Sequence, residues 1–417
     1  MIFLTISLIL IMGFTPKQKD IIKYNRVNKP IITIQEGAVR SGKTFVNLFL
    51  WWDHIHEFRG QGKVFIMTGT TIGSLQRNVL NDIENIFPDV TTTLNKNNEF
   101  QWMGNTIACF GTDKVVSYKA MKGFTAYGWL GNEVTESHKN SIDQAVKRCS
   151  GDGFRIFWDT NPGAPNHFLK TNFIDKSDSR LSNGRVYVKS HHFVLEDNSI
   201  QNGGVLTDEY IESLKLSTPS GMWYDRDILG LWVSAEGMIY KDFNLSKHTI
   251  SIVDLPKDIR TNWAGVDWGY NHKGAIGVYG NDHDGMNYRI KEIAESGKDI
   301  DWWVNEAKKL KEEFGDMIFY CDPARPEYIA KFRQSGLRAR AAENEVVPGI
   351  SFVASLYKKD LLKIVKEYNE NYLRTIFNYR WKENVTKEEP IKEDDDSQDT
   401  ERYALYSHLG KRTGTRV

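Results

Sequence analysis

One stretch of the chain has the residue types and the spacing of a phosphate-binding loop. Residues 37–44 read Gly-Ala-Val-Arg-Ser-Gly-Lys-Thr and fit the pattern GxxxxGK[ST] at every fixed position. An apolar, β-branched run precedes this loop and a helical pattern follows it, which is the context that the motif requires. In such a loop, backbone N–H groups surround the phosphates, the lysine reaches the β and γ phosphates, and the final Ser or Thr holds Mg²⁺. The expected nucleotide ligands here are Gly37, Arg40, Ser41, Gly42, Lys43 and Thr44.

A second apolar run ends in side chains suited to nucleotide hydrolysis. Residues 127–133 read Tyr-Gly-Trp-Leu-Gly-Asn-Glu. Such a strand usually ends in Asp-Glu, where one carboxylate holds Mg²⁺ and the next orients the attacking water. Asn132 stands in the place of the aspartate, so Glu133 is the candidate catalytic carboxylate. The alternative is that Glu133 only caps a strand.

Three further residues are candidates for contacts with the phosphates. Asn161 follows the run 154–158 and is placed to sense a γ-phosphate, unless Asn161-Pro162 is a plain turn. Arg40, inside the loop, and Arg148, one helical pattern after Glu133, are candidates for the cation that stabilises the transferred phosphoryl group. A solvated surface arginine is the alternative for each.

Carboxylates in the second half of the chain stand at the ends of expected elements. Asp267 and Asp322 end apolar runs, and Asp399 begins a helical run. Carboxylates placed in this way can meet at one edge of a sheet and hold two divalent ions, which clamp the attacking and leaving oxygens of a phosphodiester. Oxygen ligands favour Mg²⁺ or Mn²⁺, and Asp396 is a candidate outer ligand. Strand-end aspartates also cap turns, which is the structural alternative.

The elements that must position these residues follow two alternating patterns. Helical patterns at 44–58 and 74–86 alternate with short β-rich runs, which favours a parallel α/β sheet; the runs lie at 31–35, 64–68, 106–110, 127–130 and 154–158. A second mixed α/β pattern has a helix at 300–314 and strands at 263–268, 274–279, 288–294 and 317–321. We therefore expect domains at 1–235 and 256–417, joined by a linker at 236–255.

Length and composition agree with this division. A chain of 417 residues is too long for one ordinary core. The net charge of zero does not exclude a nucleic acid partner, because a basic groove can lie on a neutral protein. Three scattered cysteines suit a reducing cytoplasm. The apolar segment 2–14 is shorter than the ~20 residues of a spanning helix. We expect it to be buried, and a membrane anchor is the alternative.

In this order of parts, the chain resembles the large terminase subunits of tailed bacteriophages over nearly its whole length. The resemblance rests on the loop 37–44 with its arginine, the run 130–133, Thr160-Asn161-Pro162, and three acids, of which Asp399 begins a DxxRYA-like stretch. It implies an N-terminal P-loop ATPase domain, with a parallel sheet of the RecA/ASCE type, and a C-terminal RNase H-like mixed α/β nuclease domain. It also implies that Gln18, within the segment 14–18, contacts adenine.

This resemblance implies a motor subunit that hydrolyses ATP to translocate double-stranded DNA into a procapsid and that cleaves concatemeric DNA. The implied cofactors are ATP with Mg²⁺, and two Mg²⁺ or Mn²⁺ ions at the nuclease. The implied partners are double-stranded DNA, a small terminase subunit, the portal protein and further copies of the chain in a ring, with no stable membrane association. The implied place is the host cytoplasm, docked transiently on the procapsid and absent from the mature virion.

Other interpretations stay open. Four basic residues could hold DNA phosphates near the nuclease or form a solvated helix face; they are Lys331, Arg333, Arg338 and Arg340. An ATP-binding assembly switch with little turnover is suggested by Asn132. A cellular helicase-nuclease of DNA repair would need a second RecA-like domain, for which the chain has no room.

Overall fold

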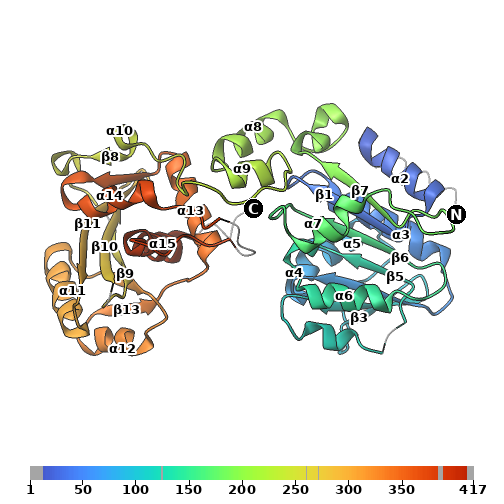
Figure 1. Ribbon diagram of the computed structural model, residues 1–417, viewed down its shortest axis with the longest axis horizontal. Coiled ribbons are helices and arrows are strands. Elements are labelled where there is room, and N and C mark those ends of the chain that lie inside the picture. Colours follow the sequence, from blue (N-terminus) through green and yellow to red (C-terminus); the bar gives the residue numbers. More distant parts are fainter. Residues whose placement is uncertain (1–12, 124, 260, 271, 384–387, 411–417) are drawn as a thin grey trace. The chain divides into compact units, whose positions relative to one another are not determined.

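The computed structural model describes residues 13–123, 125–259, 261–270, 272–383 and 388–410. They form two compact units. The first holds the residues up to Lys215 together with Tyr224–Val233, and the second holds Leu216–Trp223 and the residues from Ser234 onward. Each unit is built on a seven-stranded sheet (Figure 1). The α/β class predicted from the sequence is confirmed for both halves.

The segment 236–255 differs from the linker that we expected, because it is part of the second unit. It contains α10 (Leu245–His248) and β8 (Thr249–Ile250). β8 pairs in parallel with β14 (Leu362–Val365) at the end of the second sheet. His248 is 1% exposed and packs against the ring of Tyr357. The broken sequence pattern here reflects very short elements that are nonetheless packed.

The strands of the first sheet run in the order β3-β4-β2-β5-β6-β1-β7. All neighbours are parallel except β3 and β4, which are antiparallel. The carboxyl ends of β1, β5 and β6 therefore lie at the same edge. The strands are β1 (Ile32–Gly37), β2 (Val64–Gly69), β3 (Glu99–Trp102), β4 (Asn105–Gly111), β5 (Gly128–Gly131), β6 (Arg155–Thr160) and β7 (Val188–Phe193).

Helices cover both faces of this sheet. Neighbouring side chains of β6 show the alternation, because Phe157 joins a core with residues of α3 whereas Trp158 joins a core with Ile142 of α6. Strands buried on both faces need apolar residues at nearly every position, which explains the apolar runs in the sequence. The helices of this unit are α2 (Pro16–Asn28), α3 (Lys43–Glu57), α4 (Ile72–Leu75), α5 (Asn81–Ile86), α6 (Lys139–Arg148) and α7 (Phe168–Asn172), with a π-helix at Gln76–Leu80. α8 (Asp208–Ser217) and α9 (Met222–Asp227) each include residues of both units.

The second sheet is mixed and has the order β13-β12-β9-β10-β11-β14-β8. Its centre is an antiparallel meander of β9, β10 and β11. β12 runs parallel to β9 and to β13, and β14 runs parallel to β11. The remaining strands are β9 (Thr261–Asp267), β10 (Lys273–Asn281), β11 (Asn287–Ser296), β12 (Ile318–Cys321) and β13 (Arg338–Ala341).

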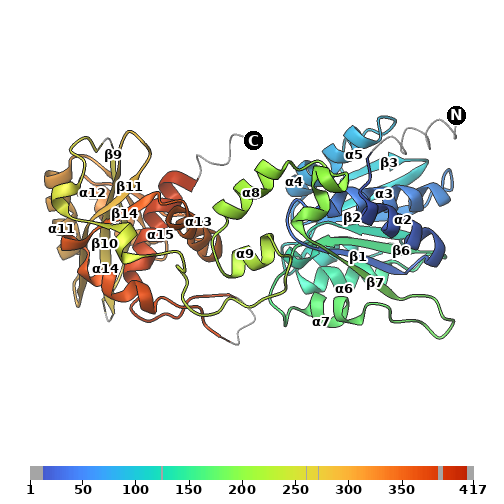
Figure 2. The same cartoon turned by 90° about the horizontal axis from the view of Figure 1, so that it is seen from above.

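Figures 1 and 2 show α15 (Asp396–Leu409) against one face of the second sheet and α11 (Ile300–Phe314) against the other. The contact of α15 with β9 is very close. A Cβ atom at Gly265 of β9 would lie 2.0 Å from the Thr400 carbonyl oxygen of α15. Glycine at this position therefore allows the helix to approach. The other helices are α12 (Pro326–Gln334), α13 (Val346–Lys358) and α14 (Glu370–Thr375).

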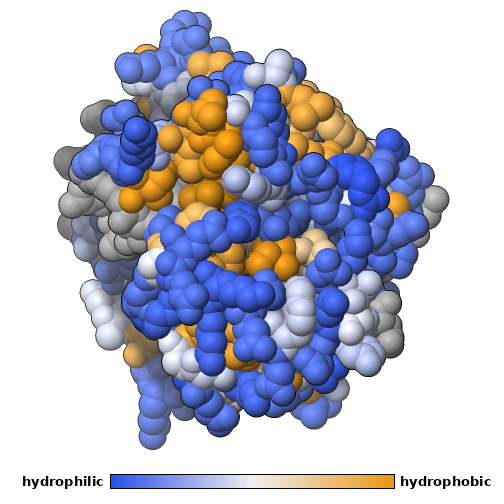
Figure 3. Space-filling model, turned by 90° about the vertical axis from the view of Figure 1, so that its left-hand side faces the viewer, coloured by the Kyte–Doolittle hydropathy of each residue, from blue (hydrophilic) through white to orange (hydrophobic). Residues whose placement is uncertain are grey.

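The outer cover of this unit is amphipathic. α11 buries Trp303, Val304, Ala307 and Leu310 against the sheet. Figure 3 views the side of the unit on which α11 lies, where hydrophilic side chains separate several groups of hydrophobic ones. The helix therefore has the two-sided character expected of a sheet cover.

The apolar segment 2–14 lies outside the described residues except for its last two. Phe14 is buried and packs on the rings of Phe45 and Phe49. Within the part of the chain that the structure describes, no helix has both the length and the apolar composition needed to cross a membrane.

Candidate functional site

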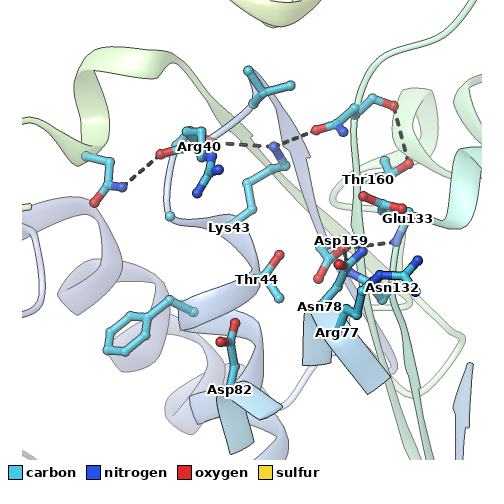
Figure 4. Close-up of a pocket in the computed structure, with 16 residues that line it drawn as sticks. Arg40, Lys43, Thr44, Arg77, Asn78, Asp82, Asn132, Glu133, Asp159 and Thr160 are labelled. Atoms are coloured by element: carbon cyan, nitrogen blue, oxygen red, sulfur yellow. Dashed lines mark hydrogen bonds between the residues drawn. The ribbon is translucent and has the colours of Figure 1, made fainter. Parts of the chain in front are cut away.

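The first candidate site is a pocket of about 630 Å³ at the carboxyl edge of the first sheet. The loop between β1 and α3 forms one side of it, and residues that follow β5 and β6 form the other (Figure 4). Gly42 has a φ of 84°, a left-handed conformation that glycine adopts freely. Arg40 has a φ of 54°. This left-handed backbone conformation is energetically unfavourable for a residue with a side chain such as arginine. Strained backbone of this kind concentrates at functional sites.

Lys43 is the cation at the centre of the pocket. Its ammonium donates to the carbonyl oxygens of Gly37 (3.0 Å) and Ala38 and to Asn161 Oδ1 (3.0 Å). Burial lowers the pKa of Lys43 to about 8, although the carboxylates of Asp159 and Glu36 act to raise it. The ammonium is thus folded back on its own loop, and phosphate oxygens can replace these acceptors.

The residues after β5 are bonded to the residues after β6. The Thr135 hydroxyl donates to the carbonyl oxygen of Asn161 (2.9 Å), and the Thr135 N–H donates to the Thr160 hydroxyl (2.9 Å). Asn161 in turn contacts Lys43. Hydrogen bonds therefore connect Lys43 with the ends of both strands.

Asn132 and Glu133 both donate to a carboxylate that the sequence analysis missed. Asn132 Nδ2 lies 2.9 Å and Glu133 N lies 3.0 Å from Asp159 Oδ1. Burial raises the pKa of Asp159, while these bonds, the charge of Lys43 and a hydrogen bond from Thr44 act to lower it. The available signal was the position of Asp159 at a strand end, two residues before Asn161.

Glu133 faces the pocket from a left-handed backbone, with a φ of 52°. Burial raises the pKa of its carboxyl, and the nearby charges of Asp159 and Glu136 raise it further. A carboxyl with a raised pKa beside a phosphate-binding loop is suited to accept a proton from water.

The two candidate arginines lie in different places. Arg40 lines the pocket. Arg148 does not, because its carbonyl oxygen accepts from the N–H of Ala126, just before the amino end of β5. The pocket lies at the carboxyl end of that strand, so the structure does not bring Arg148 into this pocket. Arg77, on the π-helix Gln76–Leu80, lines the pocket instead and was not anticipated.

Gln18 lies beside the phosphate loop. Its side chain donates to the Gly42 carbonyl oxygen (3.1 Å) and accepts from the Thr15 N–H in the capping box that begins α2. The start of α2 is therefore fixed to the loop. Contact of Gln18 with adenine stays a prediction.

The second candidate site gathers acids from β9, from the end of β12 and from the start of α15. Burial raises the pKa of Asp267 well above its usual range, and the charges of Asp399, Asp322 and Asp396 raise it further. The other three candidate ligands are thus near enough for their charges to act on Asp267. Carboxylate oxygens in such a group suit Mg²⁺ or Mn²⁺.

Basic side chains contact several of these acids. Asp399 contacts the Lys392 ammonium (2.9 Å) and the Arg402 guanidinium (3.1 Å). Lys392 also contacts Asp395 (2.8 Å), and His272 contacts Asp396 (2.9 Å). Among the described residues, no three acidic, histidine or cysteine side chains are arranged to hold one ion. A metal ion would have to displace Lys392 from Asp399.

A smaller hollow of about 290 Å³ adjoins Asp322. Its basic lining residues are Lys298, Arg325 and His272, not the four that we expected. Lys331 and Arg338 instead form ion pairs with Asp301 and Asp316 (2.9 Å each). Arg333 donates to the Ala339 carbonyl oxygen (2.8 Å), and Arg340 is exposed on β13.

Comparison with known proteins identifies the architecture. The large terminase of a thermophilic bacteriophage, in complex with ADP, is 26% identical, with a TM-score of 0.77, over 95% of this chain and 99% of that chain. The same values hold for the complex of that terminase with ATP-γ-S. A second crystal form of it gives 26% identity and a TM-score of 0.78 over 94% and 98% of the two chains. No family model and no curated protein sequence matches this chain significantly.

Substituting Lys392 tests whether its ammonium competes with metal ions. We expect Lys392→Met to raise the affinity of the acidic group for Mn²⁺ roughly tenfold, a change of about 1.4 kcal/mol, because the competing cation is removed. Titration of free Mn²⁺ by electron paramagnetic resonance measures this affinity. Lys382→Met is the matched control, since Lys382 lies in an exposed ion pair with Glu389. Equal or weaker Mn²⁺ binding by Lys392→Met would contradict the competition.

Proposed function

Since its structural neighbours over nearly the whole chain are large terminases of tailed phages, we propose that this protein is the ATPase and nuclease subunit of a phage DNA-packaging motor. In this role it hydrolyses ATP to translocate double-stranded DNA into a procapsid and cleaves concatemeric DNA. The observation that carries the proposal is the presence, in one chain with this fold, of a phosphate-loop pocket and a separate group of four acids.

The residues of the first pocket fit a nucleotide with Mg²⁺. The Thr44 hydroxyl offers an oxygen ligand of the kind that Mg²⁺ prefers, and it lines the pocket together with the carboxylate of Asp159. Bound Mg²⁺ would neutralise charge that develops on the phosphates. Lys43 would exchange its backbone carbonyl partners for phosphate oxygens, and Arg40 would add a second cation. Glu133 would orient water and accept its proton.

Coupling to DNA movement would begin at Asn161. Its side chain contacts Lys43, and its carbonyl oxygen accepts from Thr135 in the segment after Glu133. Loss of the γ-phosphate would release Lys43 to its resting acceptors. The hydrogen bonds of Asn161 and Thr135 would pass this change to the segments after β5 and β6.

The second unit would cut the DNA. Asp267, Asp322 and Asp399 would bind two Mg²⁺ or Mn²⁺ ions, with Asp396 as an outer ligand, and the ions would supply the charge that stabilises phosphodiester hydrolysis. Lys392 and His272 hold these carboxylates in the absence of metal. Lys298 and Arg325 border Asp322 and are suited to hold a DNA phosphate.

The proposed partners follow from the same role. They are double-stranded DNA, a small terminase subunit, the portal protein of a procapsid, and further copies of the chain in a ring on the portal. Gln18 would contact the adenine of ATP from its place beside Gly42. The protein would act in the host cytoplasm while docked on the procapsid.

Two substitutions test whether the chain carries two separate activities. We expect Glu133→Gln to lower the ATPase kcat by roughly 100- to 10,000-fold, because the proton acceptor is lost, without changing Mn²⁺-dependent nicking of supercoiled plasmid. We expect Asp322→Ala to abolish nicking and linearisation while ATPase activity persists. Asp316→Ala, which removes an exposed acid from the same unit, is the control.

The same assays separate the rival functions. ATP binding by folded protein without turnover would instead indicate an assembly switch. Plasmid cleavage that survives Asp322→Ala would show that the acids of the second unit are structural.

The pKa of Lys43 gives the first pocket a characteristic pH dependence. The protonated lysine pairs with phosphate, and burial lowers its pKa in the free protein to about 8. As the pH rises through this value, Lys43 of the free protein loses its proton. The lysine must then take up a proton again before it can pair with the phosphate of the nucleotide. We therefore expect the affinity for ATP-γ-S to fall by up to roughly tenfold per pH unit above about 8. Fluorescence titration from about pH 7 to about pH 10 measures it. In Lys43→Arg, whose cation keeps its proton, the curve should be flat; a flat curve for the unsubstituted protein would contradict this account.

A further inference from the structure

The first pocket has a neutral side chain at a position that usually carries charge. In phosphate-loop enzymes, the strand that corresponds to β5 usually ends in Asp-Glu, and the aspartate helps to hold Mg²⁺. Here that residue is Asn132, which is 4% exposed and lines the pocket. An amide cannot supply the negative charge of a carboxylate. Either the site works with less charge, or another residue provides it.

A carboxylate lies on the neighbouring strand at the same level. β5 and β6 run in parallel, with Gly131 opposite Trp158, so the next residues in register are Asn132 and Asp159. Asp159 is 3% exposed and lines the same pocket. Figure 4 shows its carboxylate between Thr44 on one side and Asn132 with Glu133 on the other. The charge missing from one strand end is thus present on the next.

The hydrogen bonds fix this carboxylate and favour its charged form. Asn132 Nδ2 and Glu133 N both donate to Oδ1 of Asp159, at 2.9 and 3.0 Å. Both bonds go to one oxygen, and both stabilise the ionised form. The Asn132 side chain can donate in this way only because it is an amide. An aspartate at position 132 would set two buried carboxylates against each other.

The buried carboxylate of Asp159 needs a positive charge beside it to remain ionised. Burial of an ionised carboxylate costs several kcal/mol unless a countercharge accompanies it. Lys43 is the positive charge that acts on Asp159, and a nucleotide would draw its ammonium toward phosphate. A divalent ion beside Thr44 would then be the countercharge.

We propose that Asp159, at the end of β6, supplies the carboxylate toward Mg²⁺ that Asn132 lacks, and that the Asn132 amide positions it. This inference rests on the proposed ATP-binding function of the pocket. The charged group thus lies on β6 and not after β5: Asn132, after β5, donates a hydrogen bond, and Asp159, in β6, carries the charge.

The test measures binding rather than turnover. A fluorescent ATP-γ-S analogue is titrated into the full chain with and without Mg²⁺, and Mn²⁺ bound together with ATP-γ-S is measured by electron paramagnetic resonance. We expect Asp159→Asn to weaken the metal-dependent part of nucleotide binding roughly 10- to 100-fold. Binding without metal should change little. Adding Asn132→Asp to this variant should restore most of the loss, since the carboxylate returns to the end of β5.

Controls distinguish this inference from the proposed function. Asp152→Asn changes an exposed acid of the same unit and should bind as the unsubstituted protein does. If Lys43→Ala abolishes nucleotide binding but Asp159→Asn leaves its metal dependence intact, the inference fails and the proposed function stands. The inference also fails if Asp159→Asn weakens nucleotide binding equally with and without metal, or if adding Asn132→Asp restores none of the lost binding. If the unsubstituted protein binds no ATP-γ-S, both fail.

Discussion

The carboxyl ends of parallel strands meet at one edge of a sheet, and the first pocket depends on this constraint. β1 leads into the loop that carries Lys43, while Glu133 follows β5 and Asp159 lies near the carboxyl end of β6. These residues are far apart in the chain, yet the register of β6 between β1 and β5 sets them around one cavity. The apolar strands and the helices on both faces hold that register. The phosphate binding, water activation and signalling through Asn161 that we propose all depend on it.

The second unit meets a different constraint, which is repulsion among carboxylates. The glycine at position 265 lets α15 lie directly on β9, and this contact brings Asp399 near Asp267. Such a group is unfavourable without cations. Lys392, Arg402 and His272 supply positive or hydrogen-bonding partners from within the chain. These partners offset part of the repulsion among the acids from within the chain itself.

Local signals in the sequence were sufficient for some features and insufficient for others. The phosphate loop is contiguous, so its residues could be named directly. β7 was missed because it is an edge strand whose polar residues, such as His191 and His192, resemble a loop. Asp159 was missed because its partner lies on a neighbouring strand, and strand order is not visible in the sequence. Arg148 was misplaced for a related reason, since spacing along the chain does not tell which end of a strand a residue adjoins.

Our central proposal is that one chain holds two separate metal-dependent centres for phosphate chemistry. Anomalous diffraction from crystals grown with Mn²⁺ and ATP-γ-S tests this claim most directly, because it locates the ions without assuming any activity. We predict one Mn²⁺ peak beside Thr44 and Asp159, and further peaks among Asp267, Asp322 and Asp399. A nucleotide bound in the pocket with no Mn²⁺ beside Asp159, or an acidic group without Mn²⁺ at saturating concentration, would contradict it.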